Sequence, residues 1–150
     1  MPLCKTKYFH ELEYQDQARV EFQEGLPGFE SERQFILIER PDLKPLVFVQ
    51  SLATPDLCFL TLPVLTVSPD YRLAMSDADR QVLGLRRPPA IGRDVACLAI
   101  LNVRENGTFV NLLAPLVIDL RTQRAVQAIV SEGGYSHEHP LGTEGVAKCL

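Results

Sequence analysis

Hydrophobic and polar residues alternate with a period of two along much of the chain. Leu12 and Tyr14 alternate with polar neighbours, as do Val20 and Phe22. Further short apolar runs, rich in β-branched and aromatic residues, occupy residues 35–38, 46–49, 58–62, 95–103, 109–113, 116–120 and 126–130. Because short runs bounded by Pro, Gly, Asp or Asn are typical of β-sandwiches and β-barrels, the pattern predicts an all-β, mainly antiparallel fold.

Two polar segments between these runs predict turns. Asn106-Gly107 supplies residues that accept positive φ, so it predicts a hairpin with a type I′ turn. Residues 121–124 are a weaker polar turn. Asn106-Gly107-Thr108 also reads as a glycosylation sequon, which matters only in a secreted protein, and the turn is therefore the preferred interpretation.

One segment, near residues 76–84, predicts a short helix instead of a strand. Ser76 is a favourable N-cap, and the acidic side chains of Asp77 and Asp79 suit the positive end of a helix dipole. Val82 continues the helical spacing, and Gly84 is a suitable terminator. We therefore expect one short helix within an otherwise β-rich chain.

The size and charge of the chain narrow the possible functions. With 150 residues and 46% hydrophobic residues, we expect one domain over residues 1–150 with an ordinary apolar core. The net charge is −4 and the isoelectric point about 5.4. A protein that neutralises phosphates needs clustered Lys and Arg, so this balance argues against direct nucleic-acid binding and is compatible with a basic protein partner.

The cysteines and the beginning of the chain indicate a reduced, cytoplasmic protein. Cys58 and Cys97 lie in apolar runs, where buried free thiols are common, and no metal-ligand spacing occurs. Cys4 and Cys149 lie near opposite ends of the chain, both expected to be flexible, so we expect no native disulfide. The sequence shows no signal peptide, and its longest apolar stretch, residues 95–103, is too short to span a membrane.

Two further segments are expected at the surface. Residues 86–93 contain two consecutive prolines and three arginines, and we interpret them as a solvated loop. From Glu132 the chain is rich in Gly, His and Glu, which predicts a flexible C-terminal tail over residues 132–150.

The stretch GLPGF, residues 25–29, allows three interpretations: a nucleic-acid-binding G-x-x-G loop, a turn, or part of a family signature. The first fails because Glu24 and Glu30 bracket the stretch and strands are predicted on both sides. As a turn it fits well, since Pro27 fixes φ and Gly28 accepts positive φ at the centre of a type II turn. Phe29 then returns to the core or stays exposed as a contact residue.

No arrangement of residues indicates catalysis. The G-x-S-x-G, H-E-x-x-H and P-loop motifs are absent from the sequence. His137 and His139 fall in the predicted tail, where ligands are poorly held. Asp70 and Tyr71 are a poor acid/base pair, because neighbouring residues of a strand point to opposite faces. Pro69-Asp70 is better interpreted as a turn before a strand predicted over residues 71–75. The sequence therefore predicts a protein that is not an enzyme and has no metal or cofactor.

Seven blocks of the sequence, in order, resemble the flagellar assembly factor FliW family. They are TKYF with ELEY, FQEGLPGFESERQFIL, VFVQSLATPDLCFLTLPV, SPDYRLAMSDAD, DVACLAILNV, VNLLAPLVIDLRTQRAVQAIV and YSHEHPL. The similarity covers residues 6–141, nearly the whole chain. It implies a small, mostly antiparallel β-barrel-like domain, in agreement with the strand pattern.

The resemblance also implies a function without catalysis. Members of the family are cytoplasmic antagonists of CsrA, a small homodimeric RNA-binding regulator that blocks translation of flagellin mRNA, and they also bind flagellin. Bound flagellin leaves the regulator free to repress. After flagellin is exported, the released factor inhibits the regulator allosterically, away from its RNA-binding surface.

Candidate contact residues come from the blocks that match the family. The aromatic candidates are Phe29, Phe35 and Tyr71, because aromatic side chains concentrate binding energy at interfaces. Asn111, polar within an apolar strand, is preferred as a buried hydrogen-bonding residue over an edge contact. The complete predicted partner-binding set is Leu26, Pro27, Phe29, Phe35, Asp70, Tyr71 and Asn111.

Some features depart from the family pattern, and one alternative function is retained. His10 stands where the resemblance places a glycine, residues 121–125 lack a glycine-rich turn, and residues 142–150 have no counterpart. The alternative is a small barrel that binds single-stranded nucleic acid, as OB-folds do. The net negative charge and the lack of a basic stripe with exposed aromatics argue against it.

Overall fold

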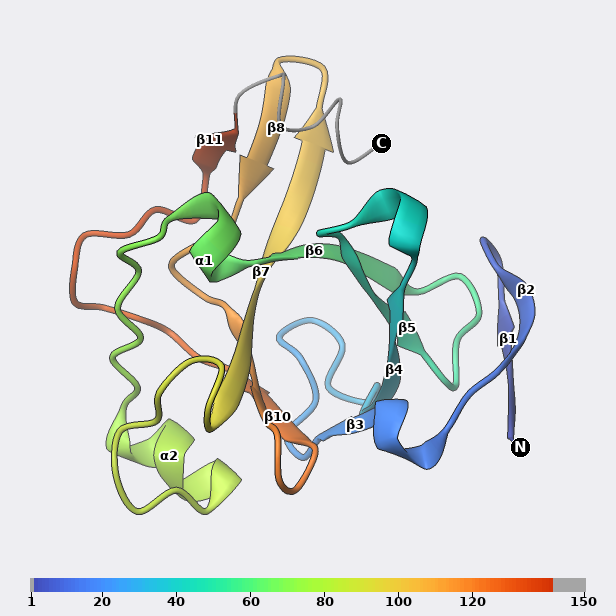
Figure 1. Ribbon diagram of the computed structural model, residues 1–150, viewed down its shortest axis with the longest axis horizontal. Helices are drawn as coiled ribbons and strands as arrows, with labels where there is room; N and C mark the ends of the chain where they lie inside the picture. Colours follow the sequence, from blue (N-terminus) through green and yellow to red (C-terminus); the bar gives the residue numbers. More distant parts are fainter. Residues whose placement is uncertain (1, 142–150) are drawn as a thin grey trace.

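The computed structural model of the chain describes residues 2–141, and strands account for most of its regular structure (Figure 1). The strands are β1 (Leu3–Thr6), β2 (His10–Glu13), β3 (Arg19–Phe22), β4 (Gln34–Glu39), β5 (Val47–Ser51), β6 (Cys58–Pro63), β7 (Val95–Arg104), β8 (Gly107–Val110), β9 (Leu116–Asp119), β10 (Arg124–Gln127) and β11 (His139–Leu141). The helices are α1 (Val64–Val67) and α2 (Asp77–Leu83), with 3₁₀ turns at Asp16–Ala18 and Pro41–Leu43.

Seven of the strands form a closed barrel in the order β7-β6-β5-β4-β3-β10-β9, and pairing of β9 with β7 completes the ring. Neighbours in the ring are antiparallel except for β3 and β10, which run parallel with Glu21 opposite Arg124. The second half of β7 leaves the ring to pair with β8, which in turn pairs with β11. The prediction of an all-β, mainly antiparallel barrel is confirmed.

The β1–β2 hairpin is a separate two-stranded ribbon on one side of the barrel (Figure 1). His10 has φ 57°, so the position where the family resemblance places a glycine does adopt the left-handed conformation. Thr6 supports this turn, because its hydroxyl donates to the carbonyl of His10 over 2.9 Å and accepts from the amide of Phe9. Cys4 lies buried in β1, so placing it at a flexible end of the chain was wrong.

The predicted helix near residues 76–84 is confirmed as α2. The Ser76 hydroxyl accepts a hydrogen bond from the amide of Asp79, and Gly84 ends the helix with φ 69°. Helix α1 was not predicted, because Val64–Val67 is rich in β-branched residues. It forms directly after Pro63 ends β6, and the amide of Ser68 closes its single turn on the carbonyl of Val64.

Two buried clusters fill the interior of the protein. One includes Leu83 of α2 together with Leu112 and Tyr71. The other includes Phe22, Phe35 and eight further buried residues, and it lies beneath the turn that follows β3. Alternation along the strands explains this arrangement, since successive side chains of a strand point to opposite faces.

Two further local predictions need correction. Residues 71–75 are not a strand, because the amide of Tyr71 bonds to the Ser68 carbonyl and the amide of Arg72 bonds to the Tyr135 hydroxyl. The β7–β8 hairpin is present, but Arg104 pairs with Gly107, so its central residues are Glu105 and Asn106. Neither has a positive φ, which excludes the type I′ turn.

The predicted tail is ordered over its first part. Tyr135 packs on Tyr71, and β11 pairs with β8 through His139, Pro140 and Leu141. The prediction of a flexible segment is therefore wrong for residues 132–141. Its remaining part, residues 142–150, lies outside the described residues.

Candidate functional site

The turn at Leu26–Phe29 holds one aromatic side chain at the surface. The amide of Phe29 donates to the carbonyl of Leu26 over 2.7 Å, and Gly28 has φ 84°. These are the features of a type II turn with Pro27 and Gly28 at its centre, as predicted. Leu26 is buried, whereas the Phe29 side chain is 40% exposed. The turn therefore places its leucine in the core and its phenylalanine toward solvent.

Gly25 fixes the conformation of the chain just before this turn. Its φ is 69°, and a β-carbon at this position would overlap the backbone of Glu30. The amide of Gly25 bonds to the carbonyl of Phe22, and the amide of Glu32 bonds to the carbonyl of Phe29. Because a residue with a side chain fits neither the φ nor the space, glycine is required here.

An aromatic row connects the exposed ring to the core. The Phe29 ring packs edge-on against Phe59 with centroids 5.7 Å apart. Phe59 lies 6.2 Å from Phe35, and Phe35 packs edge-on against Phe22 at 5.4 Å. Such pairs are worth about 0.5–1.5 kcal/mol beyond the area they bury. Phe29 is thus held in place by a packed base.

Polar contacts join this region to the loop between β5 and β6. The Glu32 carboxylate accepts hydrogen bonds from the hydroxyls of Ser51, at 2.7 Å, and Thr54. Gln50 is fully buried, and its Nε2 donates to the carbonyls of Ser51 and Pro55. The sequence pattern had not singled out Glu32 or Phe59 as functional, since neither a loop glutamate nor an apolar strand residue shows its partners in the sequence.

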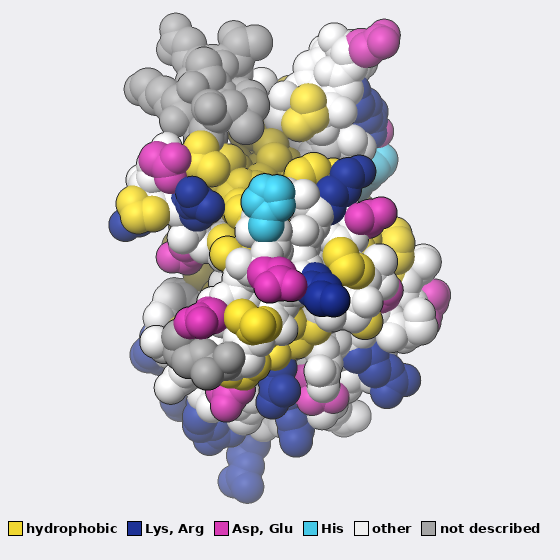
Figure 2. All heavy atoms as spheres, turned by 90° about the vertical axis from the view of Figure 1, so that its right-hand side faces the viewer, with side chains coloured by type: hydrophobic (Ala, Val, Ile, Leu, Met, Phe, Trp, Pro, Cys, Tyr) yellow, Lys and Arg dark blue, Asp and Glu magenta, His cyan; other side chains and the backbone are white. Residues whose placement is uncertain are grey.

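Acidic residues flank the turn in the sequence. Glu24 and Glu30 are both exposed on either side of the turn, and Glu30 also accepts a hydrogen bond from the amide of Gly28. We call residues 24–30 the turn surface. Figure 2 shows the face of the molecule that lies on the right in Figure 1, where hydrophobic side chains lie among acidic and basic ones and basic side chains gather at the lower end.

The predicted residues Asp70, Tyr71 and Asn111 lie in a different place from the turn. The Tyr71 side chain is 5% exposed, its hydroxyl donates to the Leu112 carbonyl over 2.6 Å, and burial raises the pKa of its phenol. Asp70 is exposed in the loop after α1. Asn111 is half-buried, and its side-chain oxygen accepts from the amide of Ala114 over 2.9 Å, so it stabilises a local turn.

The residues of the predicted partner-binding set therefore differ in burial as well as in location: some lie in the core and others are exposed. Phe35 is 0% exposed and Tyr71 nearly so, which makes them core residues and excludes them as anchors that a partner reaches in this conformation. Leu26 is buried for the same reason. Pro27, Phe29 and Asp70 are exposed, and their contact with a partner stays a prediction.

The remaining chemistry of the described residues is limited. Within residues 2–141, no group of three or more His, Cys, Asp or Glu side chains is placed to hold a metal ion. Cys4, Cys58 and Cys97 are free thiols, and burial raises the pKa of Cys58 to about 11 and that of Cys97 to about 12. Over the same residues, the helices are too short and insufficiently apolar for a membrane span.

The fold and the turn surface together define a class of protein: a small β-barrel closed by seven strands that presents one aromatic side chain on a rigid, acid-bordered turn. Comparison with known proteins identifies the family within this class. The family model described as FliW protein matches residues 3–141, and the chain belongs to this family of flagellar assembly factors.

Individual relatives agree with the family assignment. The chain is 34% identical over 145 residues to the flagellar assembly factor FliW of Geobacillus kaustophilus, covering 95% of this chain and 97% of the relative. It is 26% identical over 144 residues to that of Bacillus subtilis, with 95% and 98% covered. A crystal structure of the flagellar assembly factor FliW superimposes with a TM-score of 0.82 at 31% identity, over 95% of this chain and 99% of the other.

Proposed function

We propose that this chain is a non-enzymatic, cytoplasmic regulator of flagellar assembly that binds two protein partners in turn. The partners are flagellin and the homodimeric RNA-binding regulator CsrA. While flagellin is bound, the regulator is free to repress flagellin mRNA. Once flagellin has left the cell, the released barrel binds the regulator and relieves repression. Membership of the family of flagellar assembly factors supports the process, and the partners come from the resemblance of the sequence blocks.

The observation that carries the proposal is the exposure of Phe29 on the rigid turn surface. Its side chain is 40% exposed although the ring is packed on Phe59. An aromatic ring that is already held in place loses little conformational entropy on binding, which favours its use as an interface anchor. Pro27 stiffens the same turn and is exposed beside it.

The charge of the turn surface suits one of the two partners. Glu24 and Glu30 are exposed on both sides of Phe29. A regulator that binds RNA has a positive potential that extends beyond its RNA-binding surface, and opposite potentials steer two proteins together and suppress wrong partners. We therefore assign the CsrA contact to the turn surface, with Phe29 at its centre and the glutamates at its rim.

The test is calorimetric titration of the whole protein with purified flagellin and, separately, with the regulator from the same cell. Each titration is repeated with the other partner already bound. Binding to both partners, with each excluding the other, is the expected result. Binding to neither contradicts the proposal and leaves only the family and the fold.

A matched pair of variants connects the result to the turn surface. Phe29→Ala removes the exposed ring, whereas Leu3→Ala removes another exposed hydrophobic side chain from the separate β1–β2 ribbon. We expect only Phe29→Ala to weaken a partner. Equal affinities for the two variants would move the contact away from the turn surface.

A further inference from the structure

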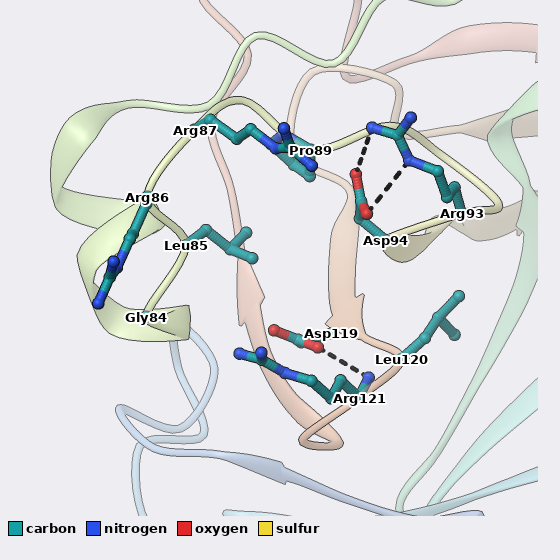
Figure 3. Close-up of a pocket in the computed structure, with 10 residues that line it drawn as sticks. All are labelled: Gly84, Leu85, Arg86, Arg87, Pro89, Arg93, Asp94, Asp119, Leu120 and Arg121. Carbon is teal, nitrogen blue, oxygen red and sulfur yellow. Dashed lines mark hydrogen bonds and ion pairs between the residues drawn. The ribbon is translucent and has the colours of Figure 1, made fainter.

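A second, chemically different site lies where α2 ends and the β9–β10 turn begins (Figure 3). It is an open cleft of about 800 Å³, a size typical of ligand sites. Two segments far apart in the sequence line it, the loop after α2 and residues 119–121. Its charged side chains, which define what we call the arginine cleft, are Arg86, Arg87, Arg93, Arg121, Asp94 and Asp119.

The arginine cleft has the opposite charge to the protein. Four arginines face two aspartates in the cleft, although the chain as a whole carries a net charge of −4. Only Arg93 is paired, with its guanidinium 3.2 Å from the Asp94 carboxylate. Arg86, Arg87 and Arg121 are exposed, and among residues 2–141 their guanidinium groups have no ion-pair or hydrogen-bond partner. Three guanidinium groups are thus available to an anionic ligand.

A buried acceptor in the same cleft is also unpartnered. Asp119 is 2% exposed, and its Oδ1 accepts hydrogen bonds from the amides of Arg121, at 2.8 Å, and Thr122. Its Oδ2 has no partner among the described residues. A buried acceptor without a donor is unfavourable. In Figure 3 the Asp119 and Arg121 side chains lie on the same side of the cleft, and Oδ2 is the unpartnered buried acceptor of this lining.

We propose that the arginine cleft binds an acidic peptide segment of a partner protein. Carboxylate side chains of the peptide pair with Arg86, Arg87 and Arg121, since the guanidinium fork matches a carboxylate. A backbone N–H of the peptide donates to Oδ2 of Asp119. A peptide is the ligand that carries both groups, an anion for the arginines and a donor for the buried aspartate.

The lining of the cleft favours a peptide over a nucleic acid. Single-strand binders combine basic grooves with aromatic side chains on which bases stack, and no aromatic residue lines this cleft. Asp94 and Asp119 would also repel a continuous phosphate backbone, whereas a peptide alternates charged side chains with N–H donors. This proposal does not depend on flagellin or CsrA being the partners at the turn surface.

The test is titration calorimetry of the full chain with an acetylated peptide of alternating glutamate and glycine. The matched control peptide carries glutamine in place of glutamate. We expect the acidic peptide alone to bind, and its affinity to fall at least about tenfold in the double variant Arg87→Gln/Arg121→Gln. Arg33→Gln removes an exposed arginine outside the cleft and is expected to change the affinity by less than about twofold.

Asp119→Asn tests the proposed hydrogen bond from the peptide backbone to Oδ2, because the sign of the change in affinity separates it from recognition by charge alone. The change keeps Oδ1 for the turn amides but removes a negative charge and replaces the free acceptor with a donor. We expect weaker binding, whereas a site that recognises charge alone would bind the acidic peptide more tightly. The melting temperatures of the variants verify that each is folded.

Several binding results would contradict the proposed peptide site. Failure of the acidic peptide to bind, or unchanged binding in the double variant, overturns the proposal. A single-stranded RNA of equal charge that binds more tightly than the peptide, with the same dependence on Arg87 and Arg121, assigns the cleft to nucleic acid instead. Inorganic phosphate that displaces the peptide at equal concentration reduces the cleft to a simple anion site.

Discussion

The turn surface and the arginine cleft are built from neighbouring parts of the barrel but offer opposite chemistry. The turn surface follows β3, and the cleft borders the turn before β10, the strand that pairs with β3. At the first, an aromatic ring rests on a packed row and glutamates surround it. At the second, exposed guanidinium groups surround an open space.

This contrast shows that the net charge of the whole chain does not predict the local charge of either surface. A net charge of −4 suggests a uniformly acidic protein, yet two glutamates flank the turn whereas four arginines line the cleft. In the two proposals, recognition at the turn surface depends mainly on a fixed aromatic ring, whereas recognition at the cleft depends mainly on charge. Salt should therefore weaken binding at the cleft more than binding at the turn surface.

The largest expected effect comes from removing a buried ring of the aromatic row on which Phe29 packs. Phe35→Ala deletes a fully buried ring that contacts both Phe22 and Phe59. We expect the free energy of unfolding to fall by about 3 to 5 kcal/mol, because the change leaves a cavity in the core. Urea denaturation followed by circular dichroism measures this.

The exposed end of the same row is the control. Phe29→Ala removes a side chain that is 40% exposed and loses one edge-on contact, so we expect the free energy of unfolding to fall by only about 1 kcal/mol. Similar losses for the two variants would mean that Phe29 is a structural residue and is poorly suited to be an anchor.

The second prediction concerns the backbone of the turn surface. Gly25→Ala combines a positive φ with an overlap against the Glu30 backbone, and we expect a loss of about 2 to 5 kcal/mol in the free energy of unfolding. Gly28→Ala is the matched control, because Gly28 also has a positive φ but faces open space. Its expected loss is about 1 to 2 kcal/mol. Denaturation of both variants compares them, and equal losses would show that the overlap is relieved by a small backbone shift.

The third prediction moves from stability to binding. If Phe29 is the anchor of the turn surface, Phe29→Ala should weaken one of the two proposed partners by about 1 to 3 kcal/mol. Arg87→Gln, in the cleft, should leave that affinity unchanged. Calorimetric titration of both variants against the same partner gives the comparison, and a loss of affinity in Arg87→Gln alone would transfer the contact to the cleft.

The strand pattern predicted the barrel well because alternation reflects burial directly. It also placed α2, since Ser76 and Gly84 mark the two ends of that helix. It missed α1, where a β-branched run becomes a single helical turn only because β6 ends at Pro63. It also predicted a strand at residues 71–75, where the hydroxyl of Tyr135, distant in sequence, accepts a backbone hydrogen bond in place of a neighbouring strand.

The candidate site was predictable only in part, for a related reason. The composition of GLPGF predicted the type II turn, but the sequence left open which way Phe29 would face. Tyr71 was a candidate anchor because it is aromatic, and the sequence does not show the hydrogen bond to the distant Leu112 that holds its side chain in the core. The arginines of residues 86–93 looked like a solvated loop, because the cleft forms only when Asp119 and Arg121 are brought opposite them.

The smallest expected change in stability concerns Asp94, the carboxylate that pairs with Arg93 in the cleft. The amide of Ala90 donates to the Asp94 carboxylate over 2.8 Å, and this hydrogen bond, with the adjacent Arg93 guanidinium, lowers the pKa of Asp94. An unfolded aspartate has a pKa of about 3.9. The ionised carboxylate therefore stabilises the fold above that pH, and its contribution is lost as the pH falls through the lower folded pKa.

Asp94→Asn should thus reduce the free energy of unfolding slightly at neutral pH, and the difference from the unsubstituted protein should shrink below about pH 4. Urea denaturation at several pH values measures the difference, and titration of the other carboxylates cancels between the two proteins. Glu138→Gln, which breaks the 2.7 Å pair with Arg104 away from the cleft, should show the same trend. Only Asp94→Asn also releases Arg93, so it alone should tighten binding of the acidic peptide. Tighter binding in both variants would mean that the peptide responds to overall charge and not to the guanidinium groups of the cleft.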